Sequence, residues 1–259
     1  MITRIISAVV GIPILIGILT WGGTPLMLAL GLVMIIGLRE FYQALSKKGF
    51  HPVEGVGYVF TVFLVFSLYR GEDWASLGIY GAFLLTTLVL LLQEKRSLQD
   101  GIFTLYGILY IPILMSYILR VDLLESPPYV IWVIFIIAFA TDTFAYFSGM
   151  FLGKHKLCPR VSPKKTIEGS IGGLTGTVIA CGVFAYFILP EALASFMILG
   201  AIGSATAQMG DLSASMVKRW TGIKDFGKIM PGHGGVLDRF DSIIFTAPLV
   251  YYYITLFVV

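Results

Sequence analysis

Long apolar segments, separated by short polar or Gly/Pro-containing breaks, run through the whole chain. A helix that crosses the hydrocarbon layer of a membrane, roughly 30 Å thick, needs about 20 mostly apolar residues. None of the segments shows the alternating pattern of a membrane barrel strand. Nine of them approach the length of a crossing helix: residues 5–20, 25–38, 56–69, 75–92, 102–119, 129–152, 170–189, 194–217 and 242–259. The pattern predicts an all-α, polytopic membrane protein with about nine transmembrane helices.

Two of the segments are short for this purpose. Residues 25–38 and 56–69 would have to be tilted, to extend beyond these limits or to form a re-entrant pair. The first segment follows Arg4 in the manner of a signal peptide, but no small-residue cleavage pattern follows it before Trp21. We therefore expect the first segment to be retained as a helix.

The composition agrees with a membrane protein. Hydrophobic residues make up 57% of the chain and charged residues 13%, which is too little charge to cover a water-facing surface. A disordered chain and a soluble domain with a single anchor are both excluded, because the apolar segments are spread along the whole length. The two cysteines, Cys158 and Cys181, offer neither a disulfide framework nor the spacing of a zinc site.

The positive charges predict the orientation of the chain. Lys and Arg residues prefer cytoplasmic loops. With nine spans and a cytoplasmic N-terminus, every Lys and Arg except Arg70 and Arg120 falls on the cytoplasmic side. We expect a protein of the inner (plasma) membrane with its N-terminus in the cytoplasm and its C-terminus outside.

Two of the predicted spans carry acidic residues. A charged group inside a span costs about 2.5–3.5 kcal/mol, so it persists mainly where it faces a polar cavity or a partner. Asp142 lies near the middle of the sixth segment. The eighth carries polar residues at helical spacing along one face: Ser204, Gln208, Asp211, Ser215 and Lys218. The alternative is that these groups only join helices, but two acids in different spans favour a shared water-filled or metal site.

Small residues follow one face of the seventh segment. They are Gly169, Gly173, Gly176 and Ala180, with Gly172 beside them. Small side chains at this spacing let two helices approach closely. We expect this face to pack against a neighbouring helix.

The basic loop at residues 153–170 follows the sixth segment. It contains five cations, one acid and two prolines. Positive-inside topology accounts for some of the cations, but two adjacent lysines lie beside hydroxyl groups and a predicted helix start, with Glu168 near the first turn. Ammonium groups in such a place suit phosphate. The candidates for substrate binding here are Ser162, Lys164, Lys165 and Thr166.

A second loop, residues 215–241, combines glycines, cations and carboxylates. The glycines of residues 231–235 can adopt left-handed backbone angles and turn N–H groups toward an anion. Asp238 and Asp241 follow three residues apart, and with Asp211 they suit an oxygen-preferring cation such as Mg²⁺. His233 is a candidate general base. It is equally a candidate to donate a hydrogen bond to phosphate, or a turn residue. Four cations add to the indication of Mg²⁺-nucleotide chemistry: Lys218, Arg219, Lys224 and Lys228.

These motifs resemble those of the phosphatidate cytidylyltransferases, also called CDP-diacylglycerol synthases. The C-terminal pattern of that family is matched by Ser215, Lys218, Arg219, Lys224, Asp225, His233, Gly234, Gly235, Asp238, Arg239 and Asp241. The run 162–169 and the segment around Asp142 also resemble the family. The first five spans resemble it only in hydropathy and size, so we expect a scaffold in residues 1–125 and a catalytic part in residues 126–259.

The resemblance implies transfer of a cytidylyl group from CTP to phosphatidic acid, giving CDP-diacylglycerol and pyrophosphate. The expected catalytic residues are Asp211, Asp238, Asp241, Lys218 and His233. The expected substrate-binding residues are Ser162, Lys164, Lys165, Thr166, Ser215, Arg219, Lys224, Gly234, Gly235 and Arg239. Mg²⁺ is expected on Asp211, Asp238 and Asp241, with a second cation considered near Asp142.

Two other functions stay open on the sequence. A CTP-dependent polyprenol or lipid kinase would release CDP instead of pyrophosphate. A secondary transporter would also place acids near mid-membrane, although no internal repeat is visible in this chain. The expected partners are CTP, phosphatidic acid and the lipid bilayer, without nucleic acid, and a homo-oligomer is left open.

Overall fold

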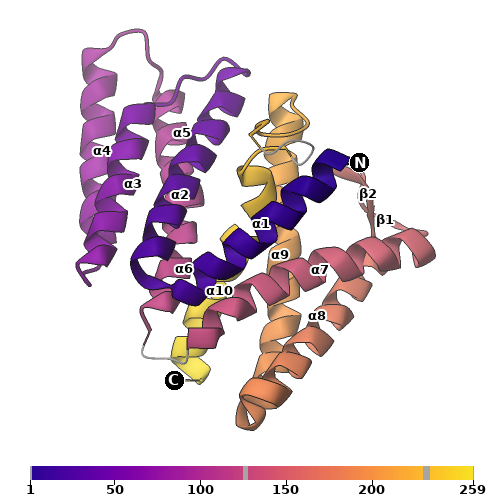
Figure 1. Cartoon of the computed structure of the whole chain (residues 1–259). Helices are drawn as coiled ribbons and strands as arrows, with labels where there is room; N and C mark the ends of the chain where they lie inside the picture. Colours follow the sequence, from indigo (N-terminus) through magenta and orange to yellow (C-terminus); the bar gives the residue numbers. More distant parts are fainter. Residues whose placement is uncertain (1, 125–127, 230–233, 259) are drawn as a thin grey trace. The chain divides into compact units, whose positions relative to one another are not determined.

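The computed structural model describes residues 2–124, 128–229 and 234–258. The chain forms two compact units. The first consists of Met1–Leu123 with Trp220–Phe240, and the second of Leu124–Arg219 with Asp241–Val259. Figure 1 traces the elements along the chain in colour.

Among the described residues, the first unit contains six whole helices. They are α1 (Ile2–Trp21), α2 (Gly23–Ser46), α3 (Glu54–Tyr69), α4 (Ala75–Leu92), α5 (Leu98–Ile108) and α6 (Leu114–Asp122). Helix α2 packs against α3, α5 and α6, and α4 packs against α3 and α5, so α2 to α5 lie side by side (Figure 1). A wide π-type turn over Leu109–Ile113 joins α5 to α6. It contains Pro112, whose missing N–H interrupts the regular helical ladder.

The second unit contains two helices and a β-hairpin, together with most of two further helices. Its elements are α7 (Ile131–Leu152), β1 (Lys156–Cys158), β2 (Ser162–Thr166), α8 (Ile167–Ile188), α9 (Leu193–Thr221) and α10 (Leu237–Phe257). The short helical turns Pro128–Val130 and Pro190–Ala192 precede α7 and α9. The last residues of α9 and the first of α10 belong to the first unit.

The all-α membrane class is confirmed. Seven helical segments of the described chain are long and apolar enough to cross a membrane, and α3 is a shorter apolar helix of 16 residues. Helix α2 has 24 residues, so the second predicted span extends beyond its expected limits and is long enough to cross a membrane.

Two helix limits expected from the sequence were wrong. Helix α9 continues to Thr221, beyond the limit expected at residue 217, so Ser215 and Lys218 are helical, as the polar stripe predicted. The chain leaves the helix at Gly222, whose φ of 75° suits a helix end. Helix α10 begins at Leu237, so Asp238 and Asp241 are also helical. The basic loop also contains a hairpin that the sequence did not predict, in which β1 and β2 pair antiparallel.

Glycines of α8 allow its close approach to α7. A Cβ atom added to Gly169 would lie 2.8 Å from the carbonyl oxygen of Ala145, and one on Gly173 would lie 3.0 Å from the carbonyl oxygen of Thr141. The buried hydroxyl groups of Thr141 and Thr177 form a hydrogen bond of 2.9 Å across the same contact. The predicted packing role of the small-residue face is confirmed.

Replacing Gly169 by Ala is expected to destabilise the protein, because the new methyl group would meet backbone atoms that cannot rotate away. Overpacking of this kind costs about 1–3 kcal/mol. The measurement is thermal unfolding of the purified protein in detergent. Gly81→Ala is the matched control, because a Cβ atom at Gly81 meets nothing within 4 Å. Equal melting temperatures for the two variants would contradict this account.

Candidate active site

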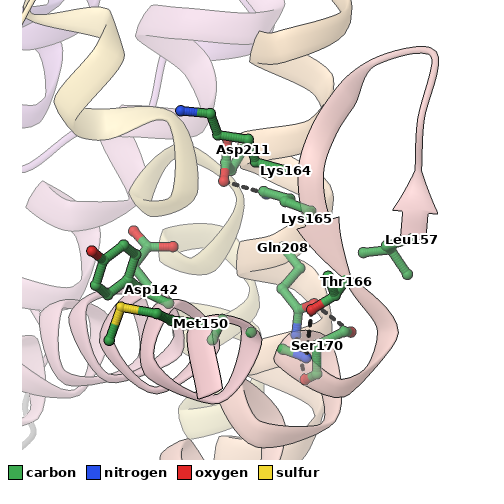
Figure 2. A pocket seen from close by; sticks show the side chains of 13 residues that line it. Asp142, Met150, Leu157, Lys164, Lys165, Thr166, Ser170, Gln208 and Asp211 are labelled. Carbon is green, nitrogen blue, oxygen red and sulfur yellow. Dashed lines mark hydrogen bonds and ion pairs between the residues drawn. The ribbon is translucent and has the colours of Figure 1, made fainter. Parts of the chain in front are cut away.

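A cavity of about 380 Å³ lies in the second unit. Residues from α7, the hairpin, α8 and α9 line it, and Figure 2 shows its side chains from close by. Tyr146, Met150 and Leu157 supply much of its apolar wall. Its charged and polar residues are Asp142, Lys164, Lys165, Thr166, Ser170, Gln208 and Asp211. The cavity therefore combines both signs of charge with an apolar wall.

An ion pair joins the hairpin to α9 within this cavity. The ammonium group of Lys165 on β2 contacts Oδ2 of Asp211, and each side chain is 25% exposed (Figure 2). At the end of α9, Nε of Arg219 donates a hydrogen bond of 3.3 Å to the carbonyl oxygen of Val161. These two contacts hold the hairpin beside the acidic face of α9.

Thr166 and Glu168 set the direction in which the hairpin enters α8. Oγ1 of Thr166 accepts a 3.1 Å hydrogen bond from the N–H of Gly169 and so caps the helix. Glu168 accepts a hydrogen bond of 3.0 Å from the backbone N–H of Lys154 and pairs with Nδ1 of His155 at 2.6 Å. The helix start predicted beside the two lysines is confirmed, and the Thr166 hydroxyl oxygen is used in capping it.

The polar stripe of α9 is continuous. Oγ of Ser170 on α8 donates to Oε1 of Gln208 at 2.5 Å, and Nε2 of Gln208 donates to Oγ of Ser204 at 3.4 Å. One turn further, Oγ of Ser215 donates to Oδ1 of Asp211 at 3.4 Å. Gln208 thus joins α8 to α9, as the alternative interpretation of the stripe proposed, whereas Asp211 lines the cavity.

Three acids from three helices of the second unit share one electrostatic neighbourhood. The carboxyl group of Asp241 on α10 interacts electrostatically with Asp211 on α9, Lys218 on α9 and Asp142 on α7. Gly210 makes the approach of α9 to α10 possible, because a Cβ atom there would collide with the backbone carbonyl oxygen of Asp241. The electrostatic interactions of Asp241 thus extend to acids of two other helices.

The donor set suits a hard divalent cation. In the described parts of the chain, no three His, Cys, Asp or Glu side chains are grouped closely enough to hold a metal ion. Mg²⁺ usually takes only one or two carboxylates and completes its shell with water and substrate phosphate oxygens. Asp211 and Asp241 supply carboxylates of this kind, so the residues present fit Mg²⁺.

Asp238, in the first unit, holds the segment that precedes α10. Its buried Oδ2 accepts hydrogen bonds from the N–H groups of Phe226, at 2.8 Å, and Gly235, at 2.9 Å. Gly234 has the left-handed backbone angle expected of it, with φ 87°. The N–H of Gly235 is therefore already engaged by Asp238, and the phosphate cradle stays a prediction. His233 lies outside the described residues, so its role stays a prediction.

Glu40 was missed by the sequence analysis. It lies on α2, is 3% exposed, and accepts hydrogen bonds from the N–H groups of Val236, at 3.1 Å, and Leu237, at 2.9 Å. It was assigned to a cytoplasmic loop because the second span was drawn to end at residue 38. The apolar residues Phe41 and Leu45 continue the helical pattern beyond it, and that signal could have revealed a buried carboxylate.

The remaining predicted residues are spread over both units. In the first unit, Lys224 and Arg239 are exposed. In the second, Lys164 is exposed, and Ser162 and Lys218 are half-buried. Exposed cations are free of the desolvation cost that burial imposes, and they suit contact with anions arriving from water.

The apolar helices and the charged cavity define a helical membrane protein with an interior polar site. The chain matches the model of the Cytidylyltransferase family over residues 2–257. It is 36% identical over 255 residues to the phosphatidate cytidylyltransferase of Staphylococcus haemolyticus, which covers 95% of this chain and 96% of the relative. The protein of the same name from Synechocystis sp. is 36% identical over 284 residues, covering 98% of this chain and 96% of the relative.

A third relative, the phosphatidate cytidylyltransferase of Staphylococcus aureus, is 34% identical over 254 residues, with 95% of this chain and 96% of the relative covered. The chain belongs to the cytidylyltransferase family, and the family resemblance found in its sequence is confirmed.

Proposed function

We propose that this protein transfers the cytidylyl group of CTP to phosphatidic acid, giving CDP-diacylglycerol and pyrophosphate. The observation that carries the proposal is the family match over residues 2–257, together with relatives named phosphatidate cytidylyltransferase that align over nearly their whole length. The cavity agrees with this reaction, because it offers cations for phosphate groups, carboxylates for a metal ion and an apolar wall for a lipid.

The proposed location is the bacterial plasma membrane, with the site open to the cytoplasm. The relatives are bacterial proteins, and seven segments of the described chain qualify as spans. The full proposal has nine spans, in which α1 and α3 also cross, the N-terminus is cytoplasmic and the C-terminus lies outside. The asymmetric placement of Lys and Arg supports it, because nearly all of them then lie on the cytoplasmic side.

The basic residues bind the phosphate groups of the two substrates in this proposal. Lys164 and Lys165 line the cavity, and Lys165 contacts Asp211 there. Ammonium and guanidinium groups form charge-assisted hydrogen bonds to phosphate oxygens and reduce repulsion between the two polyanions. The further groups proposed to bind substrate are Ser162, Thr166, Ser215, Lys218, Arg219, Lys224, Gly234, Gly235 and Arg239.

Asp211 and Asp241 would hold Mg²⁺, with Asp142 near a second cation. Asp238 stays a metal ligand predicted from the sequence alone. When bound, Mg²⁺ would neutralise phosphate charge and polarise a phosphoryl oxygen. The position of Asp211 supports this assignment, because its carboxylate lines the cavity beside residues proposed to bind phosphate.

The reaction needs little covalent catalysis by side chains of the protein. An oxygen of the phosphatidate phosphate attacks the α-phosphorus of CTP, the bond from that phosphorus to the bridging oxygen breaks, and pyrophosphate leaves. A phosphate monoester has a second pKa near 6, so the attacking group has already lost its protons at neutral pH. A general base is therefore not required. We propose instead that His233 donates a hydrogen bond to a phosphate group. Positioning and charge neutralisation supply most of the acceleration.

Purified protein incubated in detergent with CTP, phosphatidic acid and Mg²⁺ is expected to produce CDP-diacylglycerol and pyrophosphate in equal amounts. The lipid product is identified by mass spectrometry, and pyrophosphate by a coupled assay. Omission of phosphatidic acid is the control and should abolish pyrophosphate release. Formation of CDP together with a phosphorylated lipid would instead show a kinase and would overturn the proposal.

Replacing Asp211 by Asn is expected to lower kcat by about 100-fold, since loss of a group that stabilises charge in a transition state typically costs this much. The Mg²⁺ concentration that gives half-maximal activity should rise at the same time. Glu191→Gln, an exposed acid in the turn before α9, is the matched control and should keep the activity of the parent protein. Near-full activity of a folded Asp211→Asn protein at low Mg²⁺ would remove Asp211 from the metal site.

Membrane orientation is tested with single cysteines in a Cys158→Ser, Cys181→Ala background. A cysteine at Glu191 is expected to react with a membrane-impermeant thiol reagent added to intact cells, because the proposed topology places the α8–α9 turn outside. A cysteine that replaces Lys164 should react only after the membrane is permeabilised. Labelling of the Lys164 position in intact cells would refute the topology.

A further inference from the structure

The ammonium group of Lys165 and the carboxylate of Asp211 bind each other in the cavity of the second unit. Lys165 extends from β2, and its Nζ contacts Oδ2 of Asp211 on α9 (Figure 2). The other oxygen of this carboxylate, Oδ1, accepts a hydrogen bond of 3.4 Å from Oγ of Ser215. A metal ion bound at Asp211 would meet the ammonium group there, and two cations in contact with one carboxylate repel each other.

The proposed function gives these two groups different ligands. Asp211 would hold Mg²⁺, whereas Lys165 would bind a phosphate group. The ion pair uses the charge on which each of these roles depends, so neither group serves its ligand fully while it is paired with the other. Both roles can be fulfilled together only if the pair separates.

Contacts other than this ion pair hold the hairpin in place. Thr166 caps α8 by accepting a hydrogen bond of 3.1 Å from the N–H of Gly169, and β2 pairs with β1. Near the hairpin turn, Nε of Arg219 donates a hydrogen bond of 3.3 Å to the carbonyl oxygen of Val161. Lys165 has a flexible four-carbon stem, so its ammonium group can leave the carboxylate while the backbone of β2 stays in place.

The surroundings of the pair allow such a movement. The side chains of Lys165 and Asp211 are each 25% exposed, and partly hydrated ion pairs contribute little to stability. The cavity that both residues line has a volume of about 380 Å³, which lies in the usual range for ligand sites. The pair is therefore neither needed to hold the hairpin nor enclosed by packed side chains.

The acids of the cavity favour a divalent cation over a single ammonium group. The carboxyl group of Asp241 interacts electrostatically with Asp211 and with Asp142, which lines the same cavity. A divalent cation carries twice the charge of the Lys165 ammonium group, so it gains more from a neighbourhood of several carboxylates. Exchange of the ammonium group for the metal is therefore electrostatically favourable.

We propose that Lys165 is an exchangeable counter-ion of Asp211, which leaves the carboxylate when a divalent cation binds there and then binds a phosphate group of the nucleotide. This inference rests on the proposed function and on Asp211 as a metal ligand. It links the two binding events beyond the direct contact of metal and nucleotide, and by reciprocity each tightens the other. Without nucleotide, Lys165 lowers the affinity of Asp211 for the metal.

Lys165→Gln tests the competition at Asp211 in the absence of nucleotide. The probe is Mn²⁺, which shares the oxygen preference of Mg²⁺ and is measured by electron paramagnetic resonance. Only binding that is lost in Asp211→Asn is counted. The Kd for Mn²⁺ should fall about tenfold in Lys165→Gln, because the ion no longer displaces an ammonium group.

Lys164→Gln is the matched control for this measurement. It removes an exposed cation from the lining of the same cavity. Salt screens exposed charges, so at physiological ionic strength the Kd for Mn²⁺ should stay within about twofold of the parent value.

Asp211→Asn tests the release of the lysine. In the presence of EDTA this variant should bind CTP about fivefold more tightly than the parent protein in calorimetry, because Lys165 is no longer held by a carboxylate. Loss of the Asp211 charge also reduces repulsion of a polyanion, so the same substitution is made in the Lys165→Gln background. There the gain in CTP affinity should stay below about twofold, because no lysine is released.

The outcomes separate this inference from the proposed function. A Kd for Mn²⁺ in Lys165→Gln within about twofold of the parent value would overturn the exchange, and so would an equal gain in CTP affinity in both backgrounds. Failure of both Lys165→Gln and Lys165→Ala to fold would also overturn it, because the pair would then serve folding. Absence of any Mn²⁺ binding that depends on Asp211 would overturn the exchange and the metal assignment together. Absence of CDP-diacylglycerol with the unmodified protein would instead contradict the proposed function.

Discussion

The cost of burying a carboxylate is the constraint on which this structure depends. An acid inside an apolar protein persists only where cations or N–H groups compensate its charge. Asp211 has the ammonium group of Lys165, and Asp238 has the N–H groups of Phe226 and Gly235. Glu40 has the first N–H groups of α10. Each acid therefore fixes the position of a backbone segment or a cation as well as carrying charge.

Close helix packing is the second requirement of the site. Gly169 and Gly173 let α8 approach the carbonyl oxygens of α7, and Gly210 lets α9 approach the backbone of α10. These approaches bring Asp142, Asp211 and Asp241 into one electrostatic neighbourhood although they lie on three helices. Gly210 thus lets the helices that carry Asp211 and Asp241 approach each other.

Hydropathy predicted most of the helices, because a long apolar segment has few alternatives to a helix in a membrane. It failed at helix ends. The eighth segment was expected to end at residue 217, but α9 continues to Thr221, and the backbone turns at Gly222. The hairpin was missed because its pairing joins short, polar strands without an alternating apolar pattern. Glu40 was missed because its partners lie almost 200 residues away.

The sequence by itself determined the membrane class, the family and the residue types of the site, because these depend on composition and on local motifs such as the run from Ser215 to Asp241. Only the tertiary structure decided how those residues are used. It pairs Lys165 with Asp211, and it commits one oxygen of Asp238 and both of Glu40 to backbone N–H groups. These pairings depend on contacts between segments that lie far apart in the sequence. Such contacts produce no periodic pattern of residues.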